Sequence, residues 1–210
     1  MRVIVNADDL GLSGRVNDAI ARCVDAGVVT SVSVLARAPL FGEAVAMLRA
    51  RPDVSVGVHL DLTEFSSLGR FAPAARVAAE WRDQLARVRD AGLDVTHLDS
   101  HQHVHWRYPA VIAGLGVRRV RGMTGVRTDR AVGPVRAWIQ ATRARMFRAR
   151  LRALGASTTD AFGSVAVLRA LARPVATFEA MAHPGADEEE TAFLLGGGLA
   201  GVSLIGWRDL

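Results

Sequence analysis

The stretch Val95-Thr96-His97-Leu98-Asp99-Ser100-His101-Gln102-His103-Val104-His105 contains four of the six histidines of the chain. In an extended segment side chains alternate between two faces, so that Val95, His97, Asp99, His101 and His103 would share one face. Neutral imidazole is a common metal ligand, and a core rarely satisfies so many polar groups on one strand face. The pattern therefore predicts a strand over Val95–Ser100 that carries a metal or proton-transfer site.

On both sides of this stretch, short β-rich runs alternate with helical stretches. The expected strands are Met1–Asn6, Thr30–Leu35, Val54–Leu60, Val95–Ser100, Val117–Arg121, Ala176–Ala182 and Val202–Ile205. The expected helices are Arg15–Ala26, Phe41–Arg51, Pro73–Ala91, Pro109–Leu115 and Pro134–Leu154. This alternation predicts a parallel sheet built from βα units.

Length and composition favour a single domain over residues 1–210, because 210 residues, 50% of them hydrophobic, can bury one sizeable core. The sequence has no apolar stretch of the roughly 18 residues that suggest a membrane span, and its first residues do not resemble a cleavable signal. A cytoplasmic protein is expected.

All 26 basic residues are arginine. The run from Arg143 to Arg152 could form the basic helical face of a nucleic-acid binder, but no recognised nucleic-acid motif accompanies it. Arginines are also spread along the whole chain beside abundant alanine, glycine and valine. The sequence therefore predicts a solvated helix face and no nucleic-acid partner.

Polar clusters follow four of the expected strands at their C-terminal ends. They are Asn6-Ala7-Asp8-Asp9, Gly57-Val58-His59-Leu60-Asp61, His97–His105 and Glu179-Ala180-Met181-Ala182-His183-Pro184-Gly185. The C-terminal ends of parallel strands meet at one edge, where α/β proteins collect ligand-binding and catalytic residues. The four clusters are expected to converge on one site.

These motifs, in this order, resemble those of the YdjC-like carbohydrate deacetylases, which include chitooligosaccharide deacetylase and hopanoid-biosynthesis-associated members. The resemblance spans nearly the whole chain. It implies an α/β fold, a distorted, TIM-like (β/α) barrel with its site at the C-terminal ends of the strands. It also implies a hydrolase that uses one divalent metal ion to remove the acetyl group of an N-acetylated sugar or glycolipid.

The resemblance implies that Asp9, His59 and His101 bind the metal and that Asp8 is the general base. Two imidazoles and a carboxylate leave coordination positions open for water and substrate. Mg²⁺ and Zn²⁺ are favoured, and Mn²⁺, Co²⁺ and Ni²⁺ remain chemically open.

Further roles are expected for residues around this set. His183 is the candidate acid that protonates the departing amine, since imidazole titrates in the required range. His103 and His105 could replace it or bind sugar hydroxyls, and Trp106 could stack on a pyranose ring. Asp99 could orient a ligating histidine, and Asp61 could do the same or cap a turn.

Two alternative functions stay open at this point. A protein that binds a metal or a carbohydrate without catalysis would keep the ligands but not need Asp8. A set of two histidines and one carboxylate also occurs in non-haem iron oxygenases, which would leave Asp8 without an obvious task. The loop Phe65–Phe71 is short, so a homodimer in which a second subunit completes the site is a further option.

Overall fold

The computed structural model describes residues 1–123, 134–171 and 174–210. Within these residues the strands are β1 (Arg2–Leu10), β2 (Ser31–Val34), β3 (Ser55–Leu60), β4 (Val95–Ser100), β5 (Ala161–Ser164), β6 (Thr177–Ala182) and β7 (Ser203–Leu204). They form one sheet in the order β4-β3-β2-β1-β6-β5, with β7 also paired to β1. Every pair is parallel.

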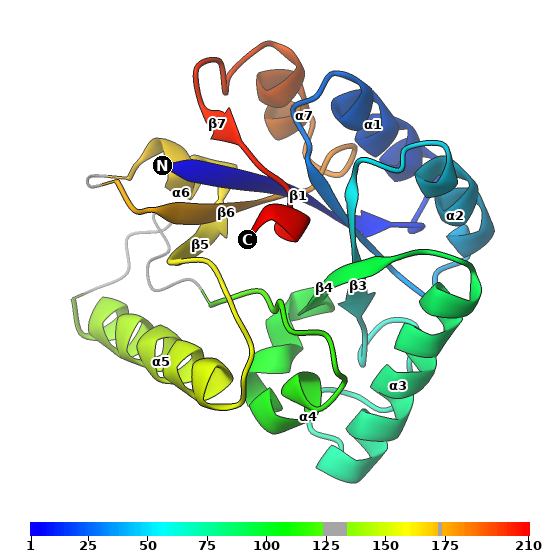
Figure 1. Ribbon diagram of the computed structural model, residues 1–210, viewed down its shortest axis with the longest axis vertical. Helices are drawn as coiled ribbons and strands as arrows, with labels where there is room; N and C mark the ends of the chain where they lie inside the picture. The colour runs from blue at the N-terminus through cyan, green and yellow to red at the C-terminus, as the bar shows by residue number, and fades with distance from the viewer. Residues whose placement is uncertain (124–133, 172–173) are drawn as a thin grey trace.

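Helices surround the curved sheet, as Figure 1 shows. They are α1 (Gly14–Asp25), α2 (Phe41–Arg49), α3 (Ala74–Asp90), α4 (Pro109–Ala113), α5 (Pro134–Ala153), α6 (Val165–Arg169) and α7 (Glu188–Leu195), with two 3₁₀ helices, η1 (His101–Arg107) and η2 (Trp207–Asp209). The predicted α/β architecture, a distorted barrel of βα units, is confirmed.

Local sequence explains the first βα unit. Eight of the nine residues of β1 are buried, as expected for a parallel strand covered on both faces. Ser13 caps α1 by accepting a hydrogen bond from the backbone N–H of Val16. Val16, Ile20 and Cys23 follow at helical spacing and are buried against the sheet.

The barrel is irregular between β4 and β5. The expected strand Val117–Arg121 is wrong: within the described residues, only single bridges join Leu98 to Val120 and Arg119 to Ser157. The sequence analysis also missed β5, α6 and α7, which are only four, five and eight residues long. Such short elements carry little periodicity to detect.

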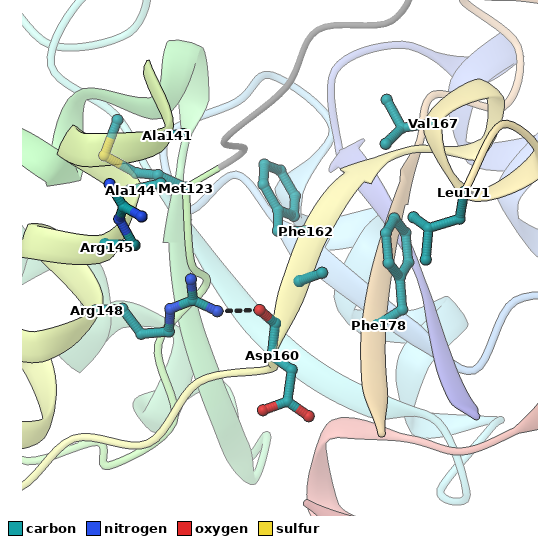
Figure 2. Close-up of a pocket in the computed structure, with 11 residues that line it drawn as sticks. Met123, Ala141, Ala144, Arg145, Arg148, Asp160, Phe162, Val167, Leu171 and Phe178 are labelled. Atoms are coloured by element: carbon teal, nitrogen blue, oxygen red, sulfur yellow. Dashed lines mark hydrogen bonds between the residues drawn. The ribbon is translucent and has the colours of Figure 1, made fainter. Parts of the chain in front are cut away.

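A cavity of about 240 Å³ lies between α5 and this irregular side of the sheet. Figure 2 shows Phe162 and Phe178 on the strands, across this space from Arg148 on α5. Arg148 donates a hydrogen bond to the backbone carbonyl of Asp160. The helix is therefore tied to the strands at this point without filling the space between them.

The 3₁₀ helix η2 closes the end of the barrel where the strands begin. The backbone N–H of Trp207 donates to Oγ of Ser31 (3.2 Å), and that of Arg208 donates to Oγ of Ser55 (3.1 Å). The Trp207 ring stacks on the ring of His97 at 5.1 Å between centroids. The opposite end, where the strands finish, carries the polar clusters.

Candidate active site

The histidine-rich stretch does not stay extended. Strand β4 ends at Ser100 and η1 begins at His101, so the expectation that one strand face continues through His103 is wrong. Gln102 and His103 have φ values of 53° and 54°, in the left-handed region that non-glycine residues seldom adopt. This turn separates His101 and His103 from the strand face that holds His97 and Asp99.

His97 belongs to the core and not to the site. Its ring is fully buried, with Nε2 at 2.9 Å from Oδ1 of Asn6 and Nδ1 at 2.9 Å from Oγ1 of Thr96. The ring packs over Gly57, where a Cβ atom would lie 2.3 Å from Nε2. Burial lowers the pKa of His97 to about 3, so the ring is neutral at physiological pH.

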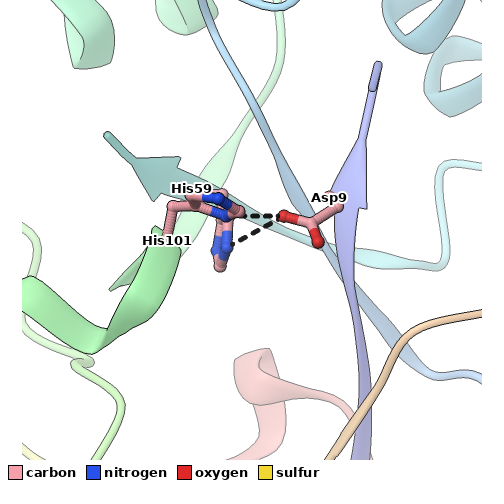
Figure 3. A group of neighbouring side chains, drawn as sticks. All are labelled: Asp9, His59 and His101. Atoms are coloured by element: carbon pink, nitrogen blue, oxygen red, sulfur yellow. Dashed lines mark hydrogen bonds and ion pairs between the residues drawn. The ribbon is translucent and has the colours of Figure 1, made fainter. Parts of the chain in front are cut away.

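Asp9, His59 and His101 converge at the C-terminal edge of the sheet (Figure 3). Oδ1 of Asp9 lies 3.3 Å from Nε2 of His59 and 3.0 Å from Nδ1 of His101. Asp9 reaches this position with a φ of 65°, next to a register irregularity in β1. Left-handed backbone of this kind is often found where a functional side chain must be aimed.

The chemistry of this trio fits a divalent metal ion. One carboxylate oxygen and one nitrogen from each histidine lie within 4.8 Å of one another, and mixed N/O sets of this kind suit several divalent ions. A second group also has its possible ligand atoms within 4.8 Å of one another, and it consists of Asp8, His59 and Asp99. The carboxylates of Asp8 and Asp99 are bound to Arg121, however, and a cation placed there would meet a like charge.

Neighbouring carboxylates orient the two histidines. Nδ1 of His59 lies 2.9 Å from Oδ1 of Asp99, which leaves Nε2 of His59 facing Asp9. Nε2 of His101 lies 2.9 Å from Oε2 of Glu64, a residue that the sequence analysis did not select. Asp61 accepts hydrogen bonds from the backbone of Thr63, Glu64 and Phe65. Asp61 thus caps the turn that presents Glu64.

Behind the trio lies the Arg121 cluster, which we define as Arg121, Asp8, Asp99 and Glu179. Nη1 and Nη2 of Arg121 donate to the two oxygens of Asp8 at 2.6 and 2.7 Å. Nη2 also lies 2.8 Å from Asp99, and Nε donates to Glu179 at 2.7 Å. The guanidinium is completely buried. One cation therefore faces three carboxylates, and Asp8 is fixed beside the candidate metal ligands.

The Arg121 cluster sets the charge states around it. Burial alone would raise the pKa of Asp8, but the charges of Arg121 and His59 and the hydrogen bonds from Arg121 together lower it. Burial would lower the pKa of His59, but the charges of Asp99 and Asp8 and the hydrogen bonds to neighbouring carboxylates together raise it well above its usual value. For Glu179, burial raises the pKa to about 7 in spite of Arg121. Glu179 is consequently the group in this cluster that titrates near neutrality.

This pKa predicts a pH-dependent effect of Glu179→Gln on stability. The pKa of Glu179 rises from 4.5 to about 7 on folding, so the native state binds the extra proton. The stability of the folded state relative to the unfolded state is therefore highest below pH 4.5, where Glu179 is protonated in both states. It falls as the pH rises through 7, because ionised Glu179 is unfavourable in the buried site. Relative to the wild type, E179Q should gain roughly 3 kcal/mol in its free energy of unfolding between pH 4.5 and 8.

Urea denaturation across this pH range measures the effect. Glu188→Gln is the matched control, because Glu188 is exposed at the start of α7. A difference between E179Q and the wild type that stays constant with pH would contradict the prediction.

The other expected site residues lie in different surroundings. Ala182 pairs with Ala7 across β6 and β1, so His183 follows at the same sheet edge as Asp8. His103 is half-buried, its Nδ1 has no partner in the described part of the chain, and burial lowers its pKa to about 4. Trp106 is half-buried beside Arg107 and Arg143. His105 has no exposed surface and lies 2.7 Å from Oγ of Ser100, so it cannot meet a sugar in this structure.

Comparison with known families assigns the chain to one of them. The profile of the family described as "YdjC-like protein" matches residues 2–200. The chain belongs to the YdjC-like family. A carbohydrate deacetylase of Brevibacillus brevis is 39% identical over an alignment of 132 residues, and the match covers 53% of this chain and 53% of that one. A chitooligosaccharide deacetylase of Klebsiella pneumoniae is 33% identical over an alignment of 152 residues, and the match covers 62% of this chain and 60% of that one. These matches span little more than half the length of the relatives.

Solved structures share the fold of this YdjC-like chain. A putative cellobiose-phosphate cleavage protein from Enterococcus faecalis superposes with a TM-score of 0.72 at 20% identity, covering 99% of this chain and 98% of that one. A deacetylase solved with substrate gives a TM-score of 0.53 at 13% identity, covering 99% and 88%. At these identities the likeness establishes the barrel architecture.

Proposed function

We propose that this protein is a metal-dependent deacetylase that hydrolyses the N-acetyl group of a sugar or of a sugar-bearing lipid. The observation that carries the proposal is the placement of Asp8, fixed by Arg121, directly beside the Asp9–His59–His101 trio. Amide hydrolysis requires a group that takes a proton from water next to a group that stabilises charge on the carbonyl. The names of the relatives support the same chemistry.

Asp9, His59 and His101 would hold the metal. A divalent ion, with Mg²⁺ or Zn²⁺ favoured, would supply Lewis-acid polarisation of the amide carbonyl and easier deprotonation of water. The residues around the trio keep its geometry: Asp99 fixes the ring of His59, and Glu64 contacts the ring of His101.

Asp8 is the general base in this proposal. Its lowered pKa keeps the carboxylate ionised at neutral pH. Oδ1 accepts hydrogen bonds from Arg121 and Asn6, whereas Oδ2 accepts one from Arg121. A carboxylate oxygen can accept two hydrogen bonds, so Oδ2 keeps a position at which to receive the proton of the attacking water.

The leaving amine and the sugar ring also need partners. His183 is the proposed acid that protonates the amine, because it follows β6 at the sheet edge next to Asp8. The unpartnered Nδ1 of His103 is a proposed contact for a sugar hydroxyl, and the half-buried Trp106 is a proposed stacking surface. His105 is left out because it is enclosed in the core.

The first experiment measures acetate released from N-acetylated mono- and oligosaccharides by the metal-loaded protein and by the same protein after chelation. We expect acetate release that chelation abolishes and that Zn²⁺ or Mg²⁺ restores, because the trio alone lacks the Lewis acid. Anaerobic assays separate this reaction from an iron oxygenase, which would require O₂. Metal binding without acetate release from any acetylated sugar would instead support a binding protein.

A further inference from the structure

Helix α5 presents a second apolar face to solvent. Val135, Trp138 and Met146 are 69%, 65% and 68% exposed, and Ile139 and Ala149 are also exposed. Positions 135, 138, 142, 146 and 149 are three or four residues apart, and Ile139 lies four residues after Val135, so these side chains share one stripe along the helix. Thr142 is the polar residue within this stripe, and its Oγ1 accepts a hydrogen bond from Arg145. We call Val135, Trp138, Ile139, Met146 and Ala149 the outer stripe.

The opposite face of α5 is already used. Ala144, Phe147 and Leu151 are buried against the barrel, and the ring of Phe147 lies 5.5 Å from that of His105 in η1. Because α5 is thus held by its inner face, the exposure of the outer stripe is not a consequence of a detached helix. A helix that is apolar on both faces has two surfaces to cover.

Arginines border the outer stripe on both sides. Arg143 and Arg150 lie seven residues apart along one side of the outer stripe. Arg145 and Arg152, also seven residues apart, lie along its other side. All four are exposed. The sequence of α5 contains six arginines and no acidic residue, a positive charge larger than the net charge of +5 of the whole chain.

We propose that α5 lies in the surface of a membrane rich in anionic phospholipid, with the outer stripe among the acyl chains and the flanking arginines at the headgroups. Interfacial helices place Trp and aliphatic side chains in the bilayer and basic side chains at its surface, and arginine stems can lie along apolar surface while the guanidinium stays in water. None of the described helices is both long and apolar enough to cross a bilayer. The proposed contact is therefore one that lies on the membrane.

The pattern fits other occupants less well. A nucleic acid would meet Trp138 and Met146 at the centre of the contact, where phosphate binding needs cations. A second copy docked through the same face would bring its arginines against those of the first, and like charges disfavour such a contact. Anionic headgroups complement the flanks and acyl chains complement the centre.

The position of α5 connects this surface to the candidate active site. A groove of about 370 Å³ between η1 and α5 is lined by Trp106, Arg107, Arg143, Met146 and Arg150, among others. One side of the groove thus belongs to the η1 segment that begins with His101, and the other to the helix at the membrane.

Flotation of the full chain with phosphatidylcholine vesicles, with and without phosphatidylglycerol, tests the proposal. We expect binding only to the anionic vesicles and its loss at high salt. Val135→Ser/Trp138→Ser and Arg145→Gln/Arg152→Gln should each weaken partitioning on the order of tenfold. Arg76→Gln/Arg89→Gln, a pair of exposed arginines on α3, is the matched control and should bind like the wild type.

Several results would overturn the proposal. The first is that the protein does not bind anionic vesicles, and the second is that the wild type and both α5 variants bind them equally. The third is that the protein binds duplex DNA more tightly than vesicles. The fourth is that the wild type is a dimer in solution and that V135S/W138S is a monomer. Acetate release from a water-soluble oligosaccharide is measured in parallel. If the α5 variants retain that activity and lose vesicle binding, the membrane contact is independent of catalysis. If the wild type binds vesicles but releases no acetate, the proposed function is wrong and the membrane contact stands.

Discussion

Arg121→Met should lower the free energy of unfolding at pH 8 by about 3–5 kcal/mol, the usual cost of breaking a buried ion pair by removing one partner. The methionine would fill the volume but leave Asp8, Asp99 and Glu179 buried without their shared cation. Because native domains are stable by only about 5–15 kcal/mol, much of the protein should unfold or precipitate during expression at 37 °C.

The pH dependence distinguishes lost charge pairing from lost packing. Protonation of the carboxylates at low pH relieves their repulsion, so the deficit of R121M should be smaller at pH 5 than at pH 8, as measured by urea denaturation. Arg118→Met is the matched control, since Arg118 is exposed three residues earlier. A deficit below about 0.5 kcal/mol, typical of a surface substitution, would show that Arg121 does not hold the cluster together.

Asp8→Asn should reduce kcat for deacetylation by about 10²–10⁴-fold, the contribution expected of a general base. The amide can no longer take a proton from water, and its NH₂ group would face the guanidinium of Arg121 instead of accepting from it. Metal affinity should change little, because the ligand trio consists of Asp9, His59 and His101.

The adjacent residue provides the contrast. Asp9→Asn should lose metal binding as well as activity, since Oδ1 of Asp9 faces both histidines. Titration with Zn²⁺ followed by acetate assays separates the two variants, and Asp94→Asn, an exposed aspartate before β4, controls for the loss of a negative charge. A D8N protein that keeps wild-type kcat would remove Asp8 from the mechanism.

The sequence was sufficient to predict the regular βα units and the edge at which polar residues gather. Runs such as Val54–Leu60 are short, apolar and followed by polar residues, so their local pattern reflects their place in a parallel sheet. The meeting of Asp9, His59 and His101 followed from that topology together with the family resemblance.

The Arg121 cluster could not be predicted in the same way. Arg121 bonds to Asp8, 113 residues away, and to Glu179, 58 residues away, and no spacing rule links such positions. One signal was available: Glu179 stands in the apolar segment Thr177–Ala182, where a charged residue requires a buried partner. The turn at Gln102 and His103 also escaped detection, because glutamine does not mark a left-handed backbone and histidine, although enriched there, is a weak signal by itself.

The pairing of β1 has a consequence for how the chain folds. Strand β1 touches β2, about 25 residues later, but its other neighbour, β6, begins at Thr177. The β1–β4 half can assemble from nearby segments, whereas closing the second half requires a very long loop, a step that is slow. Until β6 docks, β1 is an uncovered edge strand that carries the apolar residues Val3 and Val5. That half-folded species is the one in which this barrel is most exposed to pairing with another chain.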